Sequence, residues 1–406
     1  MPEKPTLKRS MNLLILTFYG LGTIIGAGIY VLIGEVAAVA GKFMPLSFFL
    51  AGLIALFTGL SYTELASRFP VSAGEAVYIK NAWNRNGLSG LVGWMIVLSG
   101  IVSAAAISNG FAGYLNVFIE LERHWAIIML CLVLCAIAVY GINLSANAIF
   151  IITVLGLSGL AYVVWIASGM ERVPDAITSS NATVLPNASN INGILVGSFL
   201  AFYAFIGFED MVNVIEEVKD PRRNFPIAIL LAIGLSMLCY LGVTYIVLQV
   251  STAEQLAQSG APLADLVIRA GVNPAFIGLI SLLAVVNGAL VQIIMASRVM
   301  YGMAKINLAP SRLGHVHAWT RTPVLATVLV ALLVLGFALL LPLASLAQLT
   351  SLIMLLVFVS INIALIVIKR RSTASAAIIP VPVFVPVLGA ISSFLLVTYQ
   401  VLNLLD

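Results

Sequence analysis

The chain has very few charged residues. Only 9% of its 406 positions are Asp, Glu, Lys or Arg, whereas 61% are hydrophobic, and the mean hydropathy is +1.11. A soluble domain needs a polar surface, so this composition excludes a soluble globular protein. We therefore expect an integral membrane protein whose surface contacts the lipid bilayer.

Cysteine and histidine are scarce as well. The three cysteines, Cys131, Cys135 and Cys239, lie inside apolar runs, where we expect them to pack as small side chains. The three histidines fall between the apolar runs, and no pair of them has a metal-ligand helix spacing. The sequence therefore predicts no metal site and no redox chemistry.

Catalytic and nucleotide-binding motifs are also missing. The sequence has no nucleophile elbow and no Gly-rich phosphate loop ending in Lys-Ser or Lys-Thr, which argues against a hydrolase and an ATP-driven pump. The pI of 9.0 comes from short loops rather than from a basic face, so we expect no nucleic-acid partner. We also expect no cofactor.

Long apolar runs are what the sequence has instead. A helix needs about 20 mostly apolar residues to cross a bilayer. On that template the sequence predicts eleven spans, at residues 13–40, 46–69, 88–119, 125–142, 147–169, 193–218, 225–250, 274–306, 324–341, 346–368 and 379–404. The polar residues 1–10 are expected to form an N-terminal tail, because the run after them is longer than a signal-peptide core.

The basic residues predict how these spans are oriented. If the N-terminus is cytoplasmic, only four of the 20 Lys and Arg residues fall on the outer side, and the other 16 face the cytoplasm; the outer four are Lys42, Arg123, Arg172 and Arg269. We therefore expect a multi-pass protein of the inner, cytoplasmic membrane with its N-terminus inside.

Two of the predicted spans are interrupted. Residues 26–28, Gly-Ala-Gly, break the first span, and residues 205–210, Phe-Ile-Gly-Phe-Glu-Asp, break the sixth. In hydrocarbon an unpaired backbone group costs several kcal/mol, so irregular backbone at membrane depth persists only where it lines a cavity or binds something. The breaks therefore predict a buried site.

The spacing of the two breaks also predicts an internal repeat. Five spans separate them, and an odd offset means that the second set of five is inserted upside down. We expect one repeat at residues 11–169 and the other at 193–370. An extracytoplasmic loop at 170–192 would join them, and an additional eleventh helix would occupy 371–406.

The first break also resembles a family signature. Residues 22–30, GTIIGAGIY, resemble the first-helix signature of the amino acid–polyamine–organocation superfamily. Four further stretches agree in the same order: FPVSAGE at 69–75, AFIGFE at 204–209, EVKDPRRNFP at 217–226 and ASRVMYGMA at 296–304. The resemblance covers nearly the whole chain. It implies an all-α, leucine-transporter-like 5+5 inverted repeat with broken helices 1 and 6, carrying amino acids or amines.

The chain departs from this superfamily in two ways. Members usually have twelve spans, whereas eleven are predicted here, which leaves the oligomeric state open. Some proton-coupled relatives carry a lysine in the fifth span, where this sequence has Gly156. A lysine ammonium standing in for a sodium ion is therefore absent.

The chemistry of the breaks predicts what they bind. The second half of the first span starts near Ala27, so the free amides of Ala27, Gly28 and Ile29 suit a carboxylate. The first halves of the two spans end near Ile24 and near residues 203–206, where free carbonyls suit an ammonium group. Together they predict a site for an α-amino acid. Close helix packing, the alternative, favours a glycine spacing of four positions rather than two.

Further residues complete the predicted site. Tyr203 matches the aromatic gate position implied by the resemblance, Ser103 and Ile107 either form a pocket wall or ease helix packing, and Asn287 either faces the site or bridges helices. The whole predicted substrate-binding set is Thr23, Ile24, Gly26, Ala27, Gly28, Ile29, Ser103, Ile107, Phe202, Tyr203, Phe205, Ile206, Gly207 and Asn287.

Glu209 is the predicted proton-linked residue. An ionisable side chain at membrane depth must face the protein interior or water, and some superfamily members use a Glu at this position for proton sensing. The alternative is that Glu209 only satisfies the free amides at the start of a half-helix.

These observations predict a secondary active transporter that moves amino acids, in particular neutral L-amino acids, across the cytoplasmic membrane by alternating access. Proton coupling and exchange both stay open. The alternatives are a polyamine or cationic amino acid exchanger, with Glu209 as the partner of the cation, and an amino acid sensor that does not transport.

Overall fold

The computed structural model describes residues 9–26, 28–70, 74–141, 146–173, 188–371 and 380–405. Within these ranges the chain is almost entirely helical and forms no named strand. Most of the predicted N-terminal tail and of the predicted loop at 170–192 lies outside them, and so does Ala27. The all-α membrane fold expected from the composition is confirmed.

Every predicted span coincides with helical structure. The corresponding helices are α1 (Leu13–Ile25) with α2 (Gly28–Ala40), α3 (Met44–Arg68), α5 (Asn86–Leu115), α6 (Arg123–Tyr140), α7 (Ala146–Ser168), α8 (Ala188–Phe202) with the 3-10 turns η2 (Tyr203–Phe205) and η3 (Glu209–Glu217), α9 (Pro221–Val250), α12 (Ala275–Lys305), α13 (Val324–Leu340), α14 (Leu343–Arg371) and α15 (Phe384–Leu405).

Shorter helices connect these elements. They are η1 (Gly41–Phe43), α4 (Gly74–Trp83), α10 (Ala253–Ala257), α11 (Pro262–Arg269) and η4 (Ser311–Gly314). By length and composition, nine helical stretches of the described chain can cross a membrane; the first of them, Leu13–Arg68, contains two predicted spans, and the apolar helix Val324–Leu340 is slightly shorter. The protein is therefore a multi-pass membrane protein.

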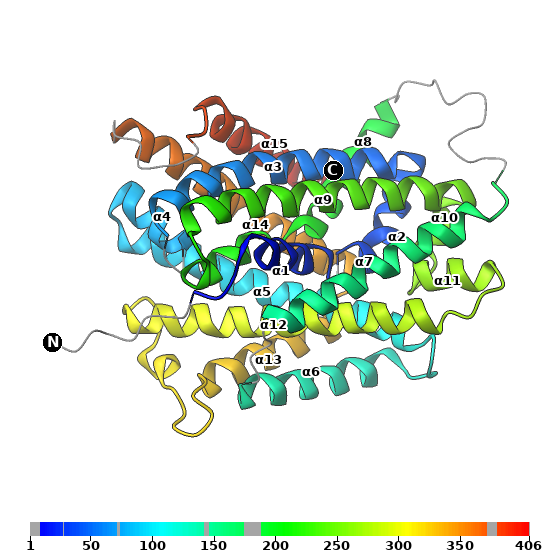
Figure 1. Cartoon of the computed structure of the whole chain (residues 1–406), viewed down its shortest axis with the longest axis horizontal. Helices are drawn as coiled ribbons and strands as arrows, with labels where there is room; N and C mark the ends of the chain where they lie inside the picture. The colour runs from blue at the N-terminus through cyan, green and yellow to red at the C-terminus, as the bar shows by residue number, and fades with distance from the viewer. Residues whose placement is uncertain are drawn as a thin grey trace.

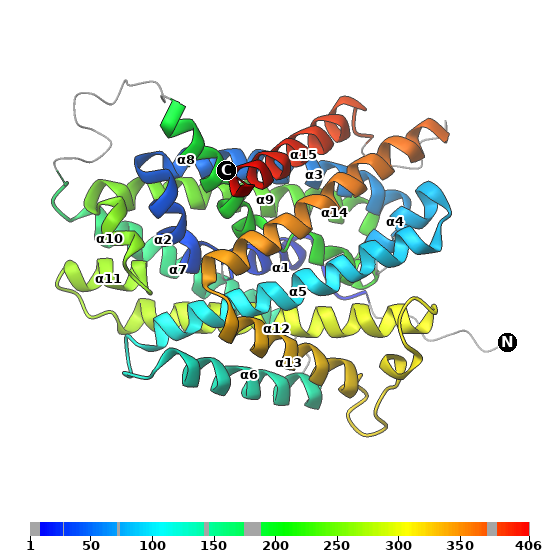
Figure 2. The same cartoon turned by 180° about the vertical axis from the view of Figure 1, so that it is seen from behind.

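The long helices run side by side along the longest axis of the molecule (Figure 1). α1 lies in the middle, α6 and α13 line one long edge, and α15 lies along the opposite edge, as the reverse view also shows (Figure 2). At the break itself Ile24, Ile25 and Ile29 are buried, so the irregular backbone there is shielded from lipid.

The packing of the broken spans is reciprocal. α3, which follows the first broken span, packs against α8 of the other broken span, and α9, which follows the second, packs against α1. α3 and α9 also pack against each other. Such an exchange is what an inverted repeat would produce; the repeat boundaries at residues 169 and 193 stay a prediction.

The start of α1 is tied to the end of η3. The amides of Ser10 and Met11 donate to the carbonyl of Glu217 at 2.9 and 3.0 Å, and the Lys219 amide donates to the Met11 carbonyl at 2.8 Å. Met11 and Val218 form an isolated parallel bridge. One end of each broken span is therefore held to the other by the main chain.

A buried ion cluster joins α3, α14 and the segment before α15. The Glu64 carboxylate is fully buried and accepts from Arg68 Nη2 at 2.6 Å, from Lys369 Nζ at 2.8 Å and from the Val381 amide at 2.8 Å. Charge pairing with this many hydrogen bonds is what a buried carboxylate needs. The cluster fixes where α15 begins.

Candidate functional site

The break in the first span is short. α1 ends at Ile25, Gly26 still has helical dihedral angles and donates its amide to the Gly22 carbonyl at 3.1 Å, and α2 begins at Gly28. A Cβ on Gly28 would lie 2.5 Å from the Cα of Ala204. Glycine is needed at position 28 because the backbone of the other broken span passes too close for any side chain.

The break in the sixth span is longer and less regular. After α8 the chain makes the 3-10 turn η2, Ile206 is extended, and Gly207 has a φ of +127°, which L side chains rarely adopt. A Cβ on Gly207 would lie 2.6 Å from the Thr23 carbonyl oxygen, and the Thr23 hydroxyl donates to the Gly207 carbonyl at 2.9 Å. The two broken spans therefore touch at both glycines.

Tyr240 of α9 bridges the two broken spans at the point where the first half of each span ends. Its hydroxyl lies 2.9 Å from the carbonyl oxygens of both Ile24 and Ala204, so it shares one proton between them. These carbonyls belong to the region predicted to hold an ammonium group, and each keeps a second lone pair. A tyrosine inside an apolar span was the available sequence signal, and the sequence reasoning missed it.

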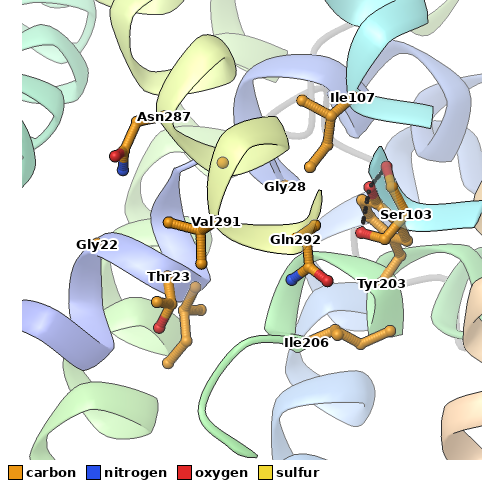
Figure 3. A pocket seen from close by; sticks show the side chains of 12 residues that line it. Gly22, Thr23, Gly28, Ser103, Ile107, Tyr203, Ile206, Asn287, Val291 and Gln292 are labelled. Carbon is orange, nitrogen blue, oxygen red and sulfur yellow. Dashed lines mark hydrogen bonds between the residues drawn. The ribbon is translucent and has the colours of Figure 1, made fainter. Parts of the chain in front are cut away.

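A cavity lies beside the two breaks (Figure 3). It is bounded by α1, the start of α2, α5, α12 and the second break. Its lining residues are Gly22, Thr23, Ile24, Gly28, Ser103, Ile107, Tyr203, Ile206, Asn287, Gly288, Val291 and Gln292. The structure thus brings together eight predicted residues: Thr23, Ile24, Gly28, Ser103, Ile107, Tyr203, Ile206 and Asn287.

Two predicted residues of the first break, Gly26 and Ile29, do not line this cavity. The Gly26 amide is engaged within α1, and the Ile29 side chain is fully buried. Ala27 lies outside the described residues. A role of these residues in ligand binding stays a prediction.

Three predicted residues of the second break also lie away from the cavity. Phe202 packs against Phe358 with ring centroids 5.6 Å apart, and Phe205 packs against Tyr240 at 5.1 Å. Gly207 contributes to the contact between the two breaks rather than to the lining. Phe202 and Phe205 therefore pack against aromatic residues of other helices and do not line the cavity.

Four lining residues are absent from the predicted set, although Gln292 was considered with Asn287 as a residue that either faces the site or bridges helices. Three of the four lie on the same helix as Asn287. Val291 follows Asn287 by four residues, and Gln292 follows Gly288 by four, so each pair lies along one face of α12. The helical period was therefore a usable signal. The fourth missed residue, Gly22, precedes the break by one turn.

The cavity walls combine polar groups with apolar surface. The Tyr203 hydroxyl lies 3.1 Å from both the Ser103 hydroxyl and the Ser103 carbonyl oxygen, which pins the ring to α5. Ile107, Ile206 and Val291 supply apolar surface, and none of the lining residues, all within the described chain, carries a charge. The lining suits a ligand with an uncharged side chain.

Asn287 carries an unused hydrogen-bonding group. Its Oδ1 atom is buried and has no hydrogen-bond partner, although the side chain lines the cavity (Figure 3). A buried acceptor without a donor costs about 1–3 kcal/mol. A ligand or water that donates to Asn287 would remove that cost.

Glu209 and Asp210 begin η3 beside the cavity. Both are buried, with 6% and 7% of their surfaces exposed. Glu209 Oε2 accepts from the Gly207 amide at 2.9 Å, and Asp210 Oδ2 accepts from Gln292 Nε2 at 3.2 Å. The amide that Glu209 accepts from belongs to Gly207, which precedes η3, and η3 has no side-chain cap. Both the proton-linked role of Glu209 and its capping alternative stay predictions.

A third acid, Glu75 of α4, lies outside the membrane-spanning helices. Burial raises the pKa of Glu75 from its ordinary 4.5 to about 7, and a hydrogen bond from the Tyr62 hydroxyl at 3.3 Å partly opposes this. In the described residues no group of three His, Cys, Asp or Glu side chains is arranged to hold a metal ion.

Comparisons with known proteins identify the family that the chain resembles. The model of the family described as "Amino acid permease" matches residues 11–404. The branched-chain amino acid permease BcaP of Bacillus subtilis is 30% identical over 90% of this chain and 82% of its own length. The methylthioribose transporter of the same organism is 26% identical over 96% and 87%.

A plant relative shows the breadth of the group. The vacuolar cationic amino acid transporter 4 of Arabidopsis thaliana is 26% identical over 89% of this chain. The match spans 64% of that transporter, so this chain covers less than two thirds of its length.

Proposed function

Because the chain belongs to the amino acid permease family, we propose that it is a secondary active transporter of neutral L-amino acids in the cytoplasmic membrane. The observation that carries the proposal is the cavity between two broken spans whose lining residues are all uncharged. The N-terminus would face the cytoplasm, as the distribution of Lys and Arg predicts.

The amino acid backbone would be held at the first break. The predicted amides of the first break, those of Ala27, Gly28 and Ile29, would receive the carboxylate, because a helix N-terminus favours negative charge. The ammonium group would lie near the carbonyls at the ends of the first halves, where Ile24 and Ala204 already share the Tyr240 proton.

The substrate side chain would lie against Ile107, Ile206 and Val291. These residues form the apolar part of the lining, and the branched-chain relative supports a substrate of this kind. A cationic side chain would be left without a counter-ion among the lining residues, which costs far more than burying a neutral group. Access would alternate as the two predicted repeats, 11–169 and 193–370, rock against each other.

The experiment is counterflow of radiolabelled L-leucine in proteoliposomes that contain the purified protein. We expect saturable, counterflow-stimulated uptake that unlabelled valine and isoleucine compete with and lysine, putrescine and methylthioribose do not. Competition by lysine or putrescine would favour the cationic exchanger. Binding without flux would favour the sensor.

A further inference from the structure

Two adjacent carboxylates lie buried at the second break. Glu209 and Asp210 follow Gly207 directly, and each is more than nine-tenths buried. Two buried carboxylates on consecutive residues of a low-dielectric interior cannot both ionise without a large electrostatic cost. At neutral pH the pair is therefore suited to hold one shared proton.

The hydrogen bonds of the pair distinguish its two members. The Gly207 amide can only donate, and its 2.9 Å bond to Glu209 Oε2 suits an ionised Glu209. Asp210 instead contacts a side-chain amide, Gln292, which has both a donor and an acceptor. A protonated Asp210 therefore has a side chain within reach that can accept its proton in a hydrogen bond.

Gln292 connects this pair to the cavity. It is a lining residue (Figure 3), and its Nε2 atom donates to Asp210 Oδ2 at 3.2 Å. An ionised Asp210 requires the NH₂ group of Gln292, whereas a protonated Asp210 can donate to the Gln292 oxygen after the amide turns over. The group that Gln292 presents to the cavity then depends on the proton.

We propose that Asp210, acting through Gln292, links proton binding to substrate binding in the transporter proposed above. Gln292 is the only lining residue hydrogen-bonded to either acid among the contacts of the described chain. This inference rests on the proposed function. It adds Gln292 as the positioning residue that conveys the protonation state of Asp210 to the cavity.

Other titratable groups lie around the pair. Tyr19 of α1 interacts electrostatically with Asp210, Tyr62 of α3 with Glu209, and Glu75 of α4 with both. Glu217 of η3 and Arg298 of α12 in turn interact with Tyr19. Glu75 is the other buried acid among them, and it acts electrostatically on both Glu209 and Asp210. The test must therefore separate Asp210 from Glu209 and from Glu75.

The experiment measures L-leucine uptake in proteoliposomes, first by counterflow and then with a gradient that is acidic outside. For one proton per leucine, a gradient of about one pH unit supports at most about tenfold accumulation. We expect Asp210→Asn to keep counterflow and lose this accumulation. Asp265→Asn, a partly buried acid of α11 hydrogen-bonded to Ser259, is the matched control and should keep both.

A second variant protects the test against a folding defect in Asp210→Asn. Gln292→Met keeps both acids but cuts the contact, so the dissociation constant for leucine should no longer change between pH 5 and pH 8. Accumulation that survives in Asp210→Asn, or that is lost only in Glu209→Gln or Glu75→Gln, would overturn the inference. The inference would also be overturned if the pH gradient did not drive leucine accumulation by the wild-type protein.

Different results would contradict the proposed transport function and the role of Asp210. Wild-type protein without leucine counterflow contradicts the proposed function, and the inference falls with it. Wild-type protein with counterflow but no pH-dependent leucine binding contradicts only the role of Asp210 and Gln292.

Discussion

The two broken spans differ in regularity and in charge. The first has α-helices on both sides of a short break and carries no acid there, whereas the second passes through a 3-10 turn, an extended residue and a left-handed glycine before two buried acids. A regular break holds its amides in fixed directions. An irregular one with titratable groups can change its state.

This difference suggests a division of roles within the proposed transporter. The first break would fix the backbone of the ligand, and the second would respond to protons. The contact between them is close, because Gly28 meets Ala204 and Gly207 meets Thr23. A response at one break therefore has a direct route to the other.

The largest effect is expected for Gly28→Val. Its new Cβ would lie 2.5 Å from the Ala204 Cα and 2.9 Å from the Ala204 oxygen, so the two broken spans must separate. We expect leucine uptake to vanish while the purified protein stays folded in thermal unfolding and size-exclusion measurements. Gly234→Val is the control, because a Cβ on Gly234 meets nothing within 4 Å. Unchanged uptake in Gly28→Val would remove the proposed site.

Glu75→Gln tests, through its effect on the stability of the protein, whether burial keeps Glu75 protonated. Because the pKa of Glu75 is about 7 in the folded protein against 4.5 ordinarily, the folded state binds more protons between these values, and its stability falls as the pH rises through them. The variant should avoid this loss. Its advantage over the wild type should be absent below pH 4.5 and reach at most about 3 kcal/mol above pH 7.

Thermal unfolding in detergent at pH 5 and pH 8 measures this difference. The Tm of Glu75→Gln should exceed that of the wild type mainly at pH 8. Equal shifts at both pH values would mean that Glu75 is not held neutral by burial.

Tyr240→Phe tests whether the two breaks share one support. Removing the hydroxyl leaves the carbonyls of Ile24 and Ala204 without their side-chain donor, which should cost about 1–3 kcal/mol of stability. Hydrogen exchange should rise at both breaks. Tyr245→Phe, an exposed tyrosine of the same helix, should behave like the wild type. Faster exchange at only one break would show that the support is not shared.

The smallest effect is expected for Thr23→Val. It removes the 2.9 Å bond from the Thr23 hydroxyl to the Gly207 carbonyl, a contact worth about 1 kcal/mol, and should weaken leucine binding several-fold. Thr327→Val is the control, since its hydroxyl bonds Pro323 in the preceding turn of the chain. Calorimetric titration with leucine compares the two; equal affinities would mean that this contact does not shape the site.

The spans could be predicted because bilayer thickness imposes a length that apolar runs reveal directly. Their ends could not be placed as well: the predicted span 88–119 is the helix Asn86–Leu115, and 346–368 is Leu343–Arg371. The short helices α10 and α11 were not predicted, because a few turns between spans give no comparable signal.

The lining of the cavity could be predicted where the local sequence carries the signal. Glycine at a break and a polar residue in an apolar helix located Gly28 and Asn287. Tyr240 and the contact of Gln292 with Asp210 depend on which helices pack together, and the latter joins residues 82 positions apart. Tertiary packing of this kind leaves no periodic trace in a single sequence.

An experimental structure of the protein saturated with L-leucine tests the central claim most directly. The account predicts ligand density in the cavity, with the carboxylate at the start of α2 beside Gly28 and the side chain against Ile107 and Val291. Density for leucine elsewhere, or leucine in the cavity with its carboxylate away from the start of α2, would contradict it.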